Sequence, residues 1–241
     1  MKQRLDVAMV SRQLVDSREK AQALILSGKV MVDGQKAEKP GHSVAETVRI
    51  EVTEPLKYVS RGGLKLEAAL AHFAVDPSGK VCMDVGTSTG GFTDCLLQHG
   101  APRVHAVDTG AGQIDWKLRT DSRVVLHEKV NARYLTAAEI GEPVQLICCD
   151  VSFISVTLLI PALAPLLEAN GDWIILVKPQ FEVGRELVGK GGIVRDPAAQ
   201  QAACEKVSKA VAAAGFKSDL TESPILGAEG NREFLLHATS R

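Results

Sequence analysis

Hydrophobic and polar positions follow two different patterns along the chain. In residues 1–55 the apolar positions form short amphipathic segments: two helices, the second of which Ser17 can cap and Gly28 can end, and a hairpin that turns at Asp33–Gly34. A loop at Pro40–Gly41 and a strand, TVRIEV, follow. The pattern predicts a small α+β domain, because so few residues can bury only a very small core.

Longer apolar runs alternate with helical patterns after a junction at residues 56–60. The expected strands are KVCMDVG, RVHAVD, RVVLHE, VQLICCD, WIILVK and REFLLHATS, and the expected helices start in SRGGLKLEAAL or cover residues 91–100, 114–119, 156–167 and 197–214. Unbroken runs such as WIILV are typical of strands buried on both faces of a parallel sheet. Residues 61–241 are therefore predicted to form an α/β domain, with helices on both faces of the sheet and ligands at the carboxyl ends of the strands.

A glycine-rich turn, MDVGTSTGGFTD, follows the first of these strands and opens a helix. Glycines lack a Cβ atom, so the backbone can turn sharply and approach a ligand, and the start of the helix offers free N–H groups. The spacing G-x-x-x-G-G departs from the G-x-G-x-x-G of nicotinamide-dinucleotide enzymes, which counts against hydride transfer. The acid before the first glycine would repel a pyrophosphate but suits the cationic methyl donor S-adenosylmethionine. The predicted donor-binding residues of the turn are Asp84, Gly86, Ser88, Gly90, Gly91 and Phe92.

Polar residues near the ends of the next two strands extend the predicted donor site. Asp108 ends RVHAVD, where an acid can bridge the ribose hydroxyls of a bound nucleoside. Asn131 follows the third strand, in position for the adenine end of the donor. Asp108 can instead be a helix cap, and a structural role is an equally good account of Asn131.

A lysine is unexpected at the end of the apolar run WIILV, because burying its ammonium costs desolvation unless it has a partner or a task. The strands VQLICCD and WIILVK place Asp150 and Lys178 at the same edge of the sheet as the glycine turn. If these strands are neighbours, the two side chains can approach each other and the donor. A buried Lys–Asp pair without a function is the competing interpretation. Lys65, at the start of the helix expected beneath the first strand, is the third member of the predicted cluster.

Several blocks of the sequence together resemble one family: SRGGLKLEAAL, MDVGTSTGGFTDCLL, CCDVSFIS, LVKPQFEVGRE, KGGIVRDP and GAEGNREFLLHA. They are similar to those of the TlyA family, proteins historically labelled hemolysins that are 2'-O-ribose methyltransferases of rRNA, and the match covers essentially the full chain. The resemblance implies a Rossmann-like methyltransferase sheet, S-adenosylmethionine as cofactor and the Lys-Asp-Lys-Glu tetrad of the FtsJ group. This tetrad falls on Lys65, Asp150, Lys178 and Glu233.

The stretch RLDVAMVSRQLVDSREKAQALILSGKVMVDGQKAEKPG resembles the small alpha-L RNA-binding module of ribosomal small-subunit protein four and several rRNA-modifying enzymes. Its basic residues, together with others in glycine-rich loops of the second domain, are candidates for phosphate contacts. Surface solubility is an equally good account of any single one. The candidates are Arg12, Arg18, Lys20, Lys36, Arg61, Arg185, Lys190 and Arg195.

The implied reaction makes specific demands on the site. A ribose 2'-hydroxyl is a poor nucleophile, so the enzyme must align oxygen, methyl carbon and sulfur and favour the charge that develops on oxygen. Lys178 is expected on the 2'-oxygen and Asp150 is expected to hold it. The lysine either accepts the proton as a neutral amine or steers the oxygen as an ammonium, and the sequence leaves both roles open. No metal is needed for this chemistry, and the sequence shows no His/Cys/Asp cluster with ligand spacing.

The family resemblance also implies a substrate. Family members methylate a cytidine 2'-hydroxyl in large-subunit rRNA, and a subset with longer termini also modifies small-subunit rRNA. This chain begins a few residues before RLDVAM and ends shortly after GNREFLLHA, so the expected partner is the large ribosomal subunit alone. Such RNA is recognised by shape and backbone contacts, with the target nucleotide exposed or flipped toward the donor.

Composition limits the alternatives. The formal net charge is −1 at pH 7, so any basic surface for RNA must be local. No apolar run approaches the roughly 18 to 20 residues of a membrane-spanning helix, and the N-terminus lacks the apolar core of a signal peptide, which favours a cytoplasmic protein without membrane contact. The five cysteines lack C-x-x-C spacing and are expected to be buried free thiols.

Two other functions compete with the methyltransferase prediction. One is a membrane-lytic hemolysin, which would need a membrane-inserting segment. The other is a non-catalytic ribosome-assembly factor, which would have no use for the full tetrad.

Overall fold

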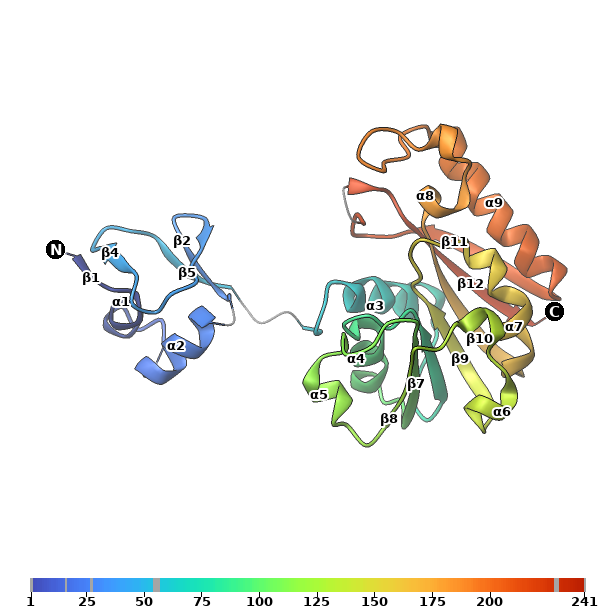
Figure 1. Ribbon diagram of the computed structural model, residues 1–241, viewed down its shortest axis with the longest axis horizontal. Helices are drawn as coiled ribbons and strands as arrows, with labels where there is room; N and C mark the ends of the chain where they lie inside the picture. The colour runs from blue at the N-terminus through green and yellow to red at the C-terminus, as the bar shows by residue number, and fades with distance from the viewer. Residues whose placement is uncertain (1, 16, 27, 54–56, 228–229, 241) are drawn as a thin grey trace. The chain divides into compact units, whose positions relative to one another are not determined.

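The computed structural model divides into two compact units, Met1–Leu56 and Lys57–Arg241, each with its own hydrophobic core (Figure 1). The described residues are 2–15, 17–26, 28–53, 57–227 and 230–240. The expected junction at Glu54–Pro55 and the first position of the expected linker, Leu56, lie outside them.

The first unit combines two helices with short antiparallel strands, as predicted. Its elements are β1 (Lys2–Arg4), α1 (Leu5–Ser11), α2 (Arg18–Leu26), β2 (Val30–Val32), β3 (Gln35–Lys36), β4 (Ser43–Ala45) and β5 (Ile50–Val52). Strand β2 pairs with β3 and β5, and β1 pairs with β4. Asp33 and Gly34 have φ angles of 48° and 78°, the left-handed conformations that an Asp-Gly hairpin turn favours. Strands β1 and β4 are too short to appear in the hydrophobic pattern.

The second unit is a mixed α/β domain. Its helices are α3 (Gly62–Phe73), α4 (Gly91–Gln98), α5 (Trp116–Arg119), α6 (Ala137–Ile140), α7 (Ile160–Leu163), α8 (Pro179–Glu182) and α9 (Pro197–Ala213), with 3-10 turns η1 (Ala132–Tyr134), η2 (Val156–Leu158), η3 (Ala164–Leu166) and η4 (Arg185–Leu187). Its strands are β6 (Val81–Val85), β7 (Arg103–Asp108), β8 (Val124–Glu128), β9 (Val144–Cys149), β10 (Leu167–Val177), β11 (Phe216–Glu222) and β12 (Phe234–Ser240).

The strands of this unit form one sheet in the order β11-β12-β10-β9-β6-β7-β8. Strands β10, β9, β6, β7 and β8 run parallel, whereas β12 is antiparallel to both β10 and β11. The chain moves outward from β6 to β7 and β8 and then crosses to β9 on the other side of β6. This reversal is a topological switch point, where open α/β sheets bind ligands. The order confirms the predicted Rossmann-like sheet, with the strands VQLICCD and WIILVK as neighbours.

Alternate residues of the interior strands pack into two cores on opposite faces of the sheet. Met83 and Ile147 belong to the core that includes residues of α6, α7 and α9. Cys82 and Leu146 belong to the core that includes residues of α3, α4 and α5, and Figure 1 shows these two sets of helices on opposite sides of the strands. Two-sided burial explains the unbroken apolar runs of the sequence. All five cysteines are buried free thiols, as expected.

Two segments differ from the predicted elements. Residues 156–167, predicted as one helix, form the short pieces η2, α7 and η3. Pro161 and Pro165 explain the interruption, because proline lacks the N–H that continues a helix and clashes with the preceding turn. The sequence pattern also misses β11, an edge strand whose residues FKSDLTE are mostly polar and exposed or half-buried.

Candidate active site

The carboxyl edge of the parallel strands gathers the predicted site residues. Asp108 ends β7, Asp150 directly follows β9, and Lys178 directly follows β10. Strand β12 runs in the opposite direction, and its first residue pairs with the last residue of β10. Glu233, which precedes β12, therefore reaches the same edge of the sheet as Lys178.

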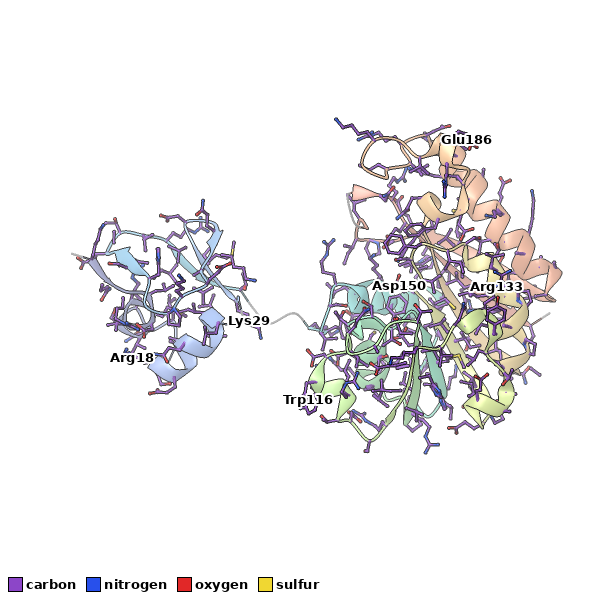
Figure 2. All side chains as sticks on the ribbon, in the orientation of Figure 1. Arg18, Lys29, Trp116, Arg133, Asp150 and Glu186 are labelled. Carbon is purple, nitrogen blue, oxygen red and sulfur yellow. The ribbon has the colours of Figure 1, made fainter. Side chains whose placement is uncertain are left out.

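Lys178 and Asp150 form an ion pair at this edge. Lys178 Nζ lies 2.6 Å from Asp150 Oδ1, and the two side chains are 12% and 22% exposed. Asp150 Oδ1 has no hydrogen-bond partner among the described residues, so the pair is at contact distance without hydrogen-bond alignment. Lys178 Nζ donates its hydrogen bond to Ser152 Oγ, at 2.9 Å. The prediction that the two side chains approach each other is confirmed, and Figure 2 labels Asp150 within the second unit.

Lys65 and Glu233 form a second ion pair. Lys65 lies in the first turn of α3, and its Nζ is 2.5 Å from Glu233 Oε2. The two side chains are only 11% and 2% exposed. Glu233 also lies against Gly227, where any Cβ atom would overlap the Glu233 carboxylate. The pair therefore joins residues far apart in the sequence inside the domain.

Two cavities adjoin at the same edge. One has a volume of about 440 Å³ and the other about 240 Å³, and they share Gly86, Ser88, Asp150 and Ser152. The larger cavity, called the donor cavity below, is also lined by Asp108, Asn131 and Phe153. The smaller one, called the acceptor cavity, is also lined by Lys65, Gly91, Phe92 and Lys178. Three tetrad members thus face the acceptor cavity, and Glu233 contacts the site through Lys65.

Asp108 and Asn131 both line the donor cavity but differ in their bonds. Asp108 Oδ2 accepts the Ser88 N–H at 2.8 Å, and Oδ1 accepts the Gly110 N–H at 2.7 Å. A carboxylate offers about four acceptor positions, so two remain for ligand hydroxyls. Asn131 caps η1 by accepting the Arg133 N–H at 3.1 Å, which is the structural role that its sequence position left open.

The glycines of the turn are packed against protein atoms. Gly86 and Gly90 have φ angles of 87° and 96°, which other residues rarely adopt. A Cβ at Gly86 would overlap the carbonyl group of Asp150, and one at Gly90 would overlap Leu118 in α5. Gly90 lines neither cavity. A larger residue at position 90 would therefore first disrupt packing against α5.

Asp84 lies beneath the turn rather than in a cavity. It is fully buried, and its Oδ2 accepts the N–H and the hydroxyl of Thr93 at 2.9 and 2.6 Å. Within the described structure Oδ1 has no hydrogen-bond partner. Burial raises the pKa of Asp84 to about 7, the nearby charge of Asp150 adds to the rise, and the bonds from Thr93 oppose it. The carboxyl group thus supports the turn through α4 and does not face the donor cavity.

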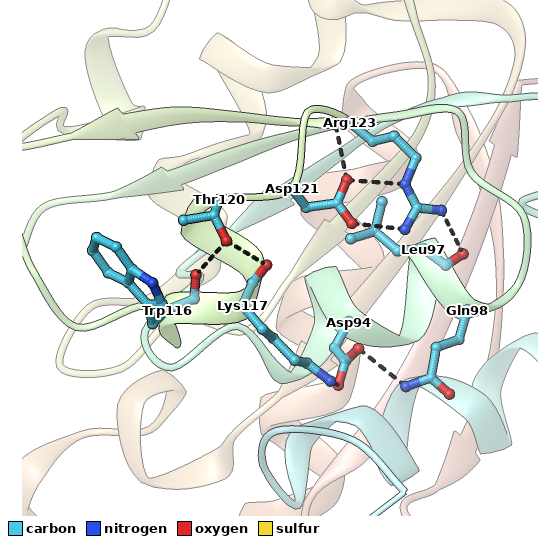
Figure 3. A network of polar contacts seen from close by, with 8 residues as sticks. All are labelled: Asp94, Leu97, Gln98, Trp116, Lys117, Thr120, Asp121 and Arg123. Atoms are coloured by element: carbon cyan, nitrogen blue, oxygen red, sulfur yellow. Dashed lines mark hydrogen bonds and ion pairs between the residues drawn. The ribbon is translucent and has the colours of Figure 1, made fainter.

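Helix α4, which begins with the last glycine of the turn, is anchored by Asp94. Asp94 Oδ2 accepts Lys117 Nζ at 3.0 Å and the Val59 N–H at 2.8 Å, and Oδ1 accepts Gln98 Nε2 at 3.0 Å. Figure 3 shows the contacts to Lys117 in α5 and to Gln98. These contacts tie the helix that supports the glycine turn to both α5 and the segment that precedes α3.

The loop after β9 contains residues that sequence reasoning did not select. Ser152 lines both cavities, and Phe153 lines the donor cavity with a side chain that is 92% exposed. Phe153 has a φ of 65°, which is uncommon for a bulky residue and often marks a functional loop. Its ring offers a surface on which a base can stack. The sequence CCDVSFIS could have indicated both residues, because a serine and an aromatic residue follow the acid at the end of the strand.

Two of the predicted RNA-binding residues are engaged within the first unit. The Arg12 guanidinium donates to three backbone carbonyl groups of residues 45–48, at 2.6 to 3.2 Å, which accounts for Arg12 as part of the fold. Arg18 lies 3.1 Å from the buried carboxylate of Asp6 and is half-exposed. Arg4 binds the same carboxylate, and its hydrogen bonds are the main reason that the pKa of Asp6 is far below the ordinary value.

Five of the other predicted RNA-binding residues lie on the surface. Exposed side chains are those of Lys36, Arg61, Arg185, Lys190 and Arg195, while that of Lys20 lies outside the described structure. Arg61 donates a hydrogen bond to the Leu226 carbonyl at 3.0 Å. Lys36 also lines a cavity of about 540 Å³ in the first unit, which contains none of the tetrad residues.

Comparison with known proteins identifies both units. The FtsJ-like methyltransferase family matches residues 58–240, and the S4 domain matches residues 3–50. The 16S/23S rRNA (cytidine-2'-O)-methyltransferase TlyA of Mycobacterium tuberculosis is 44% identical over 236 residues, which cover 97% of this chain and 88% of that protein. The 23S rRNA (cytidine-2'-O)-methyltransferase TlyA of Campylobacter jejuni is 36% identical over 248 residues, covering 95% and 96%.

A solved structure agrees with these matches. It belongs to a protein described as a "putative hemolysin" from Streptococcus thermophilus, and it is 43% identical with a TM-score of 0.77, covering 99% of this chain and 88% of that one. No helix in the described parts of the present chain is both long and apolar enough to cross a membrane. The same residues contain no group of three or more His, Cys, Asp or Glu suited to a metal ion. With matches over almost its full length, the chain belongs to the TlyA family, in which an S4 domain precedes an FtsJ-like methyltransferase domain.

Proposed function

We propose that this chain transfers a methyl group from S-adenosylmethionine to the 2'-oxygen of a cytidine ribose in large-subunit rRNA. The observation that carries the proposal is the Lys178–Asp150 pair, at 2.6 Å, in an acceptor cavity that also contains Lys65. This cavity shares Gly86 and Ser88 with a donor cavity that contains Asp108. A methyl group can pass between the two without leaving the protein.

The donor cavity suits S-adenosylmethionine. Asp108 retains acceptor positions for two ribose hydroxyls after binding the N–H groups of Ser88 and Gly110. Gly86 turns the backbone at the boundary of the two cavities, where a side chain would overlap Asp150. The bound donor supplies an electrophilic methyl group on a sulfonium. The protein contributes the position of that group relative to the acceptor.

Lys178 acts on the 2'-oxygen in this proposal. Its Nζ donates a hydrogen bond to Ser152 and lies 2.6 Å from Asp150, so the nitrogen is held where it lines the acceptor cavity. As an amine, Lys178 accepts the hydroxyl proton while the oxygen attacks; as an ammonium, it stabilises the negative charge that develops on that oxygen. Asp150 balances the charge of the ammonium, which is present from the start in the second case and forms on proton transfer in the first.

Lys65 and Glu233 supply the second half of the charge balance. Lys65 brings an additional positive group to the acceptor cavity, where it can contact ribose or phosphate oxygens. Glu233 is almost fully buried and compensates that charge at 2.5 Å. A buried lysine without this partner would be costly, so Glu233 holds Lys65 in position.

The proposed RNA target rests on the relatives and on the S4 domain. Both named relatives act on 23S rRNA and one of them also acts on 16S rRNA, so the large-subunit RNA is the substrate that they share. We place phosphate contacts on exposed Lys36, Arg185, Lys190 and Arg195, which would position the RNA without reading its sequence. A ribosomal substrate also places the reaction in the cytoplasm.

Mapping of transferred methyl groups tests this function. Ribosomal subunits from cells that lack the protein are incubated with the enzyme and tritiated S-adenosylmethionine, and the labelled nucleotide is identified. Label on a cytidine 2'-oxygen of 23S rRNA is expected. Label only in small-subunit RNA would overturn the target, and label on bases would overturn the 2'-O chemistry. Binding without any label would favour a ribosome-assembly factor instead.

A truncated protein tests the separate roles of the two units. Removal of residues 1–55 should abolish methylation of subunits, because the S4 domain is proposed to supply much of the RNA affinity. Donor binding, measured by calorimetry, should persist because both cavities belong to the second unit. Full methylation by the truncated protein would show that the second unit binds the RNA alone.

A further inference from the structure

Two segments that follow neighbouring parallel strands contact each other at several points. Residues 150–156 follow β9, and Lys178 with helix α8 follows β10. At one end of this contact, Lys178 lies close to Asp150 and Ser152. The two segments therefore meet at the boundary of the donor and acceptor cavities, which Asp150 and Ser152 both line.

The other end of the contact is independent of Lys178. Glu182, only 6% exposed, accepts the Ser155 hydroxyl at 2.5 Å and the Val156 N–H at 2.7 Å. Between the two ends, the rings of Phe153 and Phe181 lie 5.4 Å apart. The loop that carries Ser152 is thus held against α8 whether or not Lys178 has a bound substrate.

Geometry at the lysine nitrogen gives Ser152 a role. A tetrahedral nitrogen has three directions besides its bond to Cε, and Ser152 Oγ accepts a hydrogen bond along one of them at 2.9 Å. Asp150 Oδ1 lies 2.6 Å away without hydrogen-bond alignment, so with Asp150 alone the group could still rotate about the Cε–Nζ bond. The hydrogen bond to Ser152 removes that rotation, so the other directions of the nitrogen have a defined orientation.

We propose that Ser152 is a positioning residue for methyl transfer, whose hydroxyl fixes the rotation of Lys178 Nζ so that the nitrogen faces the substrate oxygen. This inference rests on the proposed 2'-O-methyltransferase function. It extends the tetrad by a neutral residue that does not itself exchange a proton. Ser152 accepts a hydrogen bond from Lys178 in the charged and in the neutral form of the lysine, so the orientation holds during the whole reaction.

Substitutions at Ser152 in the full-length protein test the inference. Ser152→Ala should slow single-turnover transfer to large ribosomal subunits by about tenfold or more, the effect of losing one hydrogen bond to a reacting group. The dissociation constant for S-adenosylmethionine, the half-saturating concentration of subunits and Tm should stay at wild-type values. Ser152→Thr keeps the hydroxyl and should restore most of the rate.

A second serine on the same loop provides the control. Ser155→Ala removes the bond to Glu182 and should lower Tm with a smaller effect on the transfer rate. An equal slowing in Ser155→Ala, no slowing in Ser152→Ala, or no recovery in Ser152→Thr would overturn the inference while leaving an active wild type. A wild type that transfers no methyl group to ribose would instead overturn the proposed function, and the inference with it.

Discussion

Replacing Lys178 by methionine tests whether this lysine serves the reaction or only the fold. At 2.6 Å the pair with Asp150 has a gross attraction of about 6 kcal/mol for an effective dielectric constant of about 20. Desolvation offsets most of that attraction, and the Asp150 side chain keeps 22% exposure. We therefore expect Lys178→Met to lower the free energy of unfolding by about 2 kcal/mol, less than the roughly 3–5 kcal/mol of breaking a fully buried pair. In a domain of this size, Tm falls by about 4–8 °C.

The effect on activity should be far larger than the effect on stability. We expect kcat to fall by about 100-fold to 10,000-fold, the usual contribution of a group that acts on the reacting proton or charge, with donor affinity unchanged. The double variant Lys178→Met/Asp150→Asn no longer leaves a carboxylate without its partner, so it should regain much of the stability and remain inactive. Thermal unfolding, calorimetry and single-turnover transfer measure these quantities. Wild-type turnover by Lys178→Met, or activity that returns with stability in the double variant, would refute the reasoning.

Three further substitutions test the rest of the site. Asp108→Asn should weaken S-adenosylmethionine binding by about tenfold in calorimetry, because an amide offers fewer acceptor positions to the ribose, and unchanged affinity would contradict the assignment. The pKa of Asp84 is about 7 in the folded protein and about 4 when unfolded, so the native state holds the extra proton and stability should fall as pH rises from about 4 to about 7. Asp84→Asn should flatten that fall in urea unfolding, whereas an unchanged slope would speak against burial as its cause. Arg12→Ala should lower Tm of the first unit, and Lys36→Ala should weaken RNA binding at unchanged Tm; the reverse result would exchange their roles.

The positions of Asp108, Asp150 and Lys178 could be predicted from the sequence, because strands buried on both faces show long apolar runs that end abruptly at polar residues. Parallel order then brings those ends to one edge. Glu233 could not be placed in this way, since its position depends on the antiparallel direction of β12, which the hydrophobic pattern does not state. Only the family resemblance indicated it.

The direction in which each side chain points could not be predicted from the sequence. Asp84 and Asp108 both stand near the end of a strand, yet one is buried under the glycine turn and the other faces a cavity. Gly90 indicated a special backbone conformation but not that its neighbour is Leu118 rather than a ligand. Arg12 appeared to be one basic surface residue among several, and its bonds to residues 45–48 exist only after the first unit has folded.

The interior position of β12 has a consequence for biosynthesis. This strand follows all the others along the chain, yet it pairs on both sides, with β10 and with β11. A nascent chain that ends before residue 233 already contains Lys65, Asp150 and Lys178. In this chain β11 has no neighbour in the sheet, and Lys65 lacks the carboxylate of Glu233. A stop codon or frameshift shortly before residue 233 would therefore remove an interior strand together with the last charged residue of the site. Incomplete translation products should be both unstable and inactive, so methyl transfer begins only with the nearly finished chain.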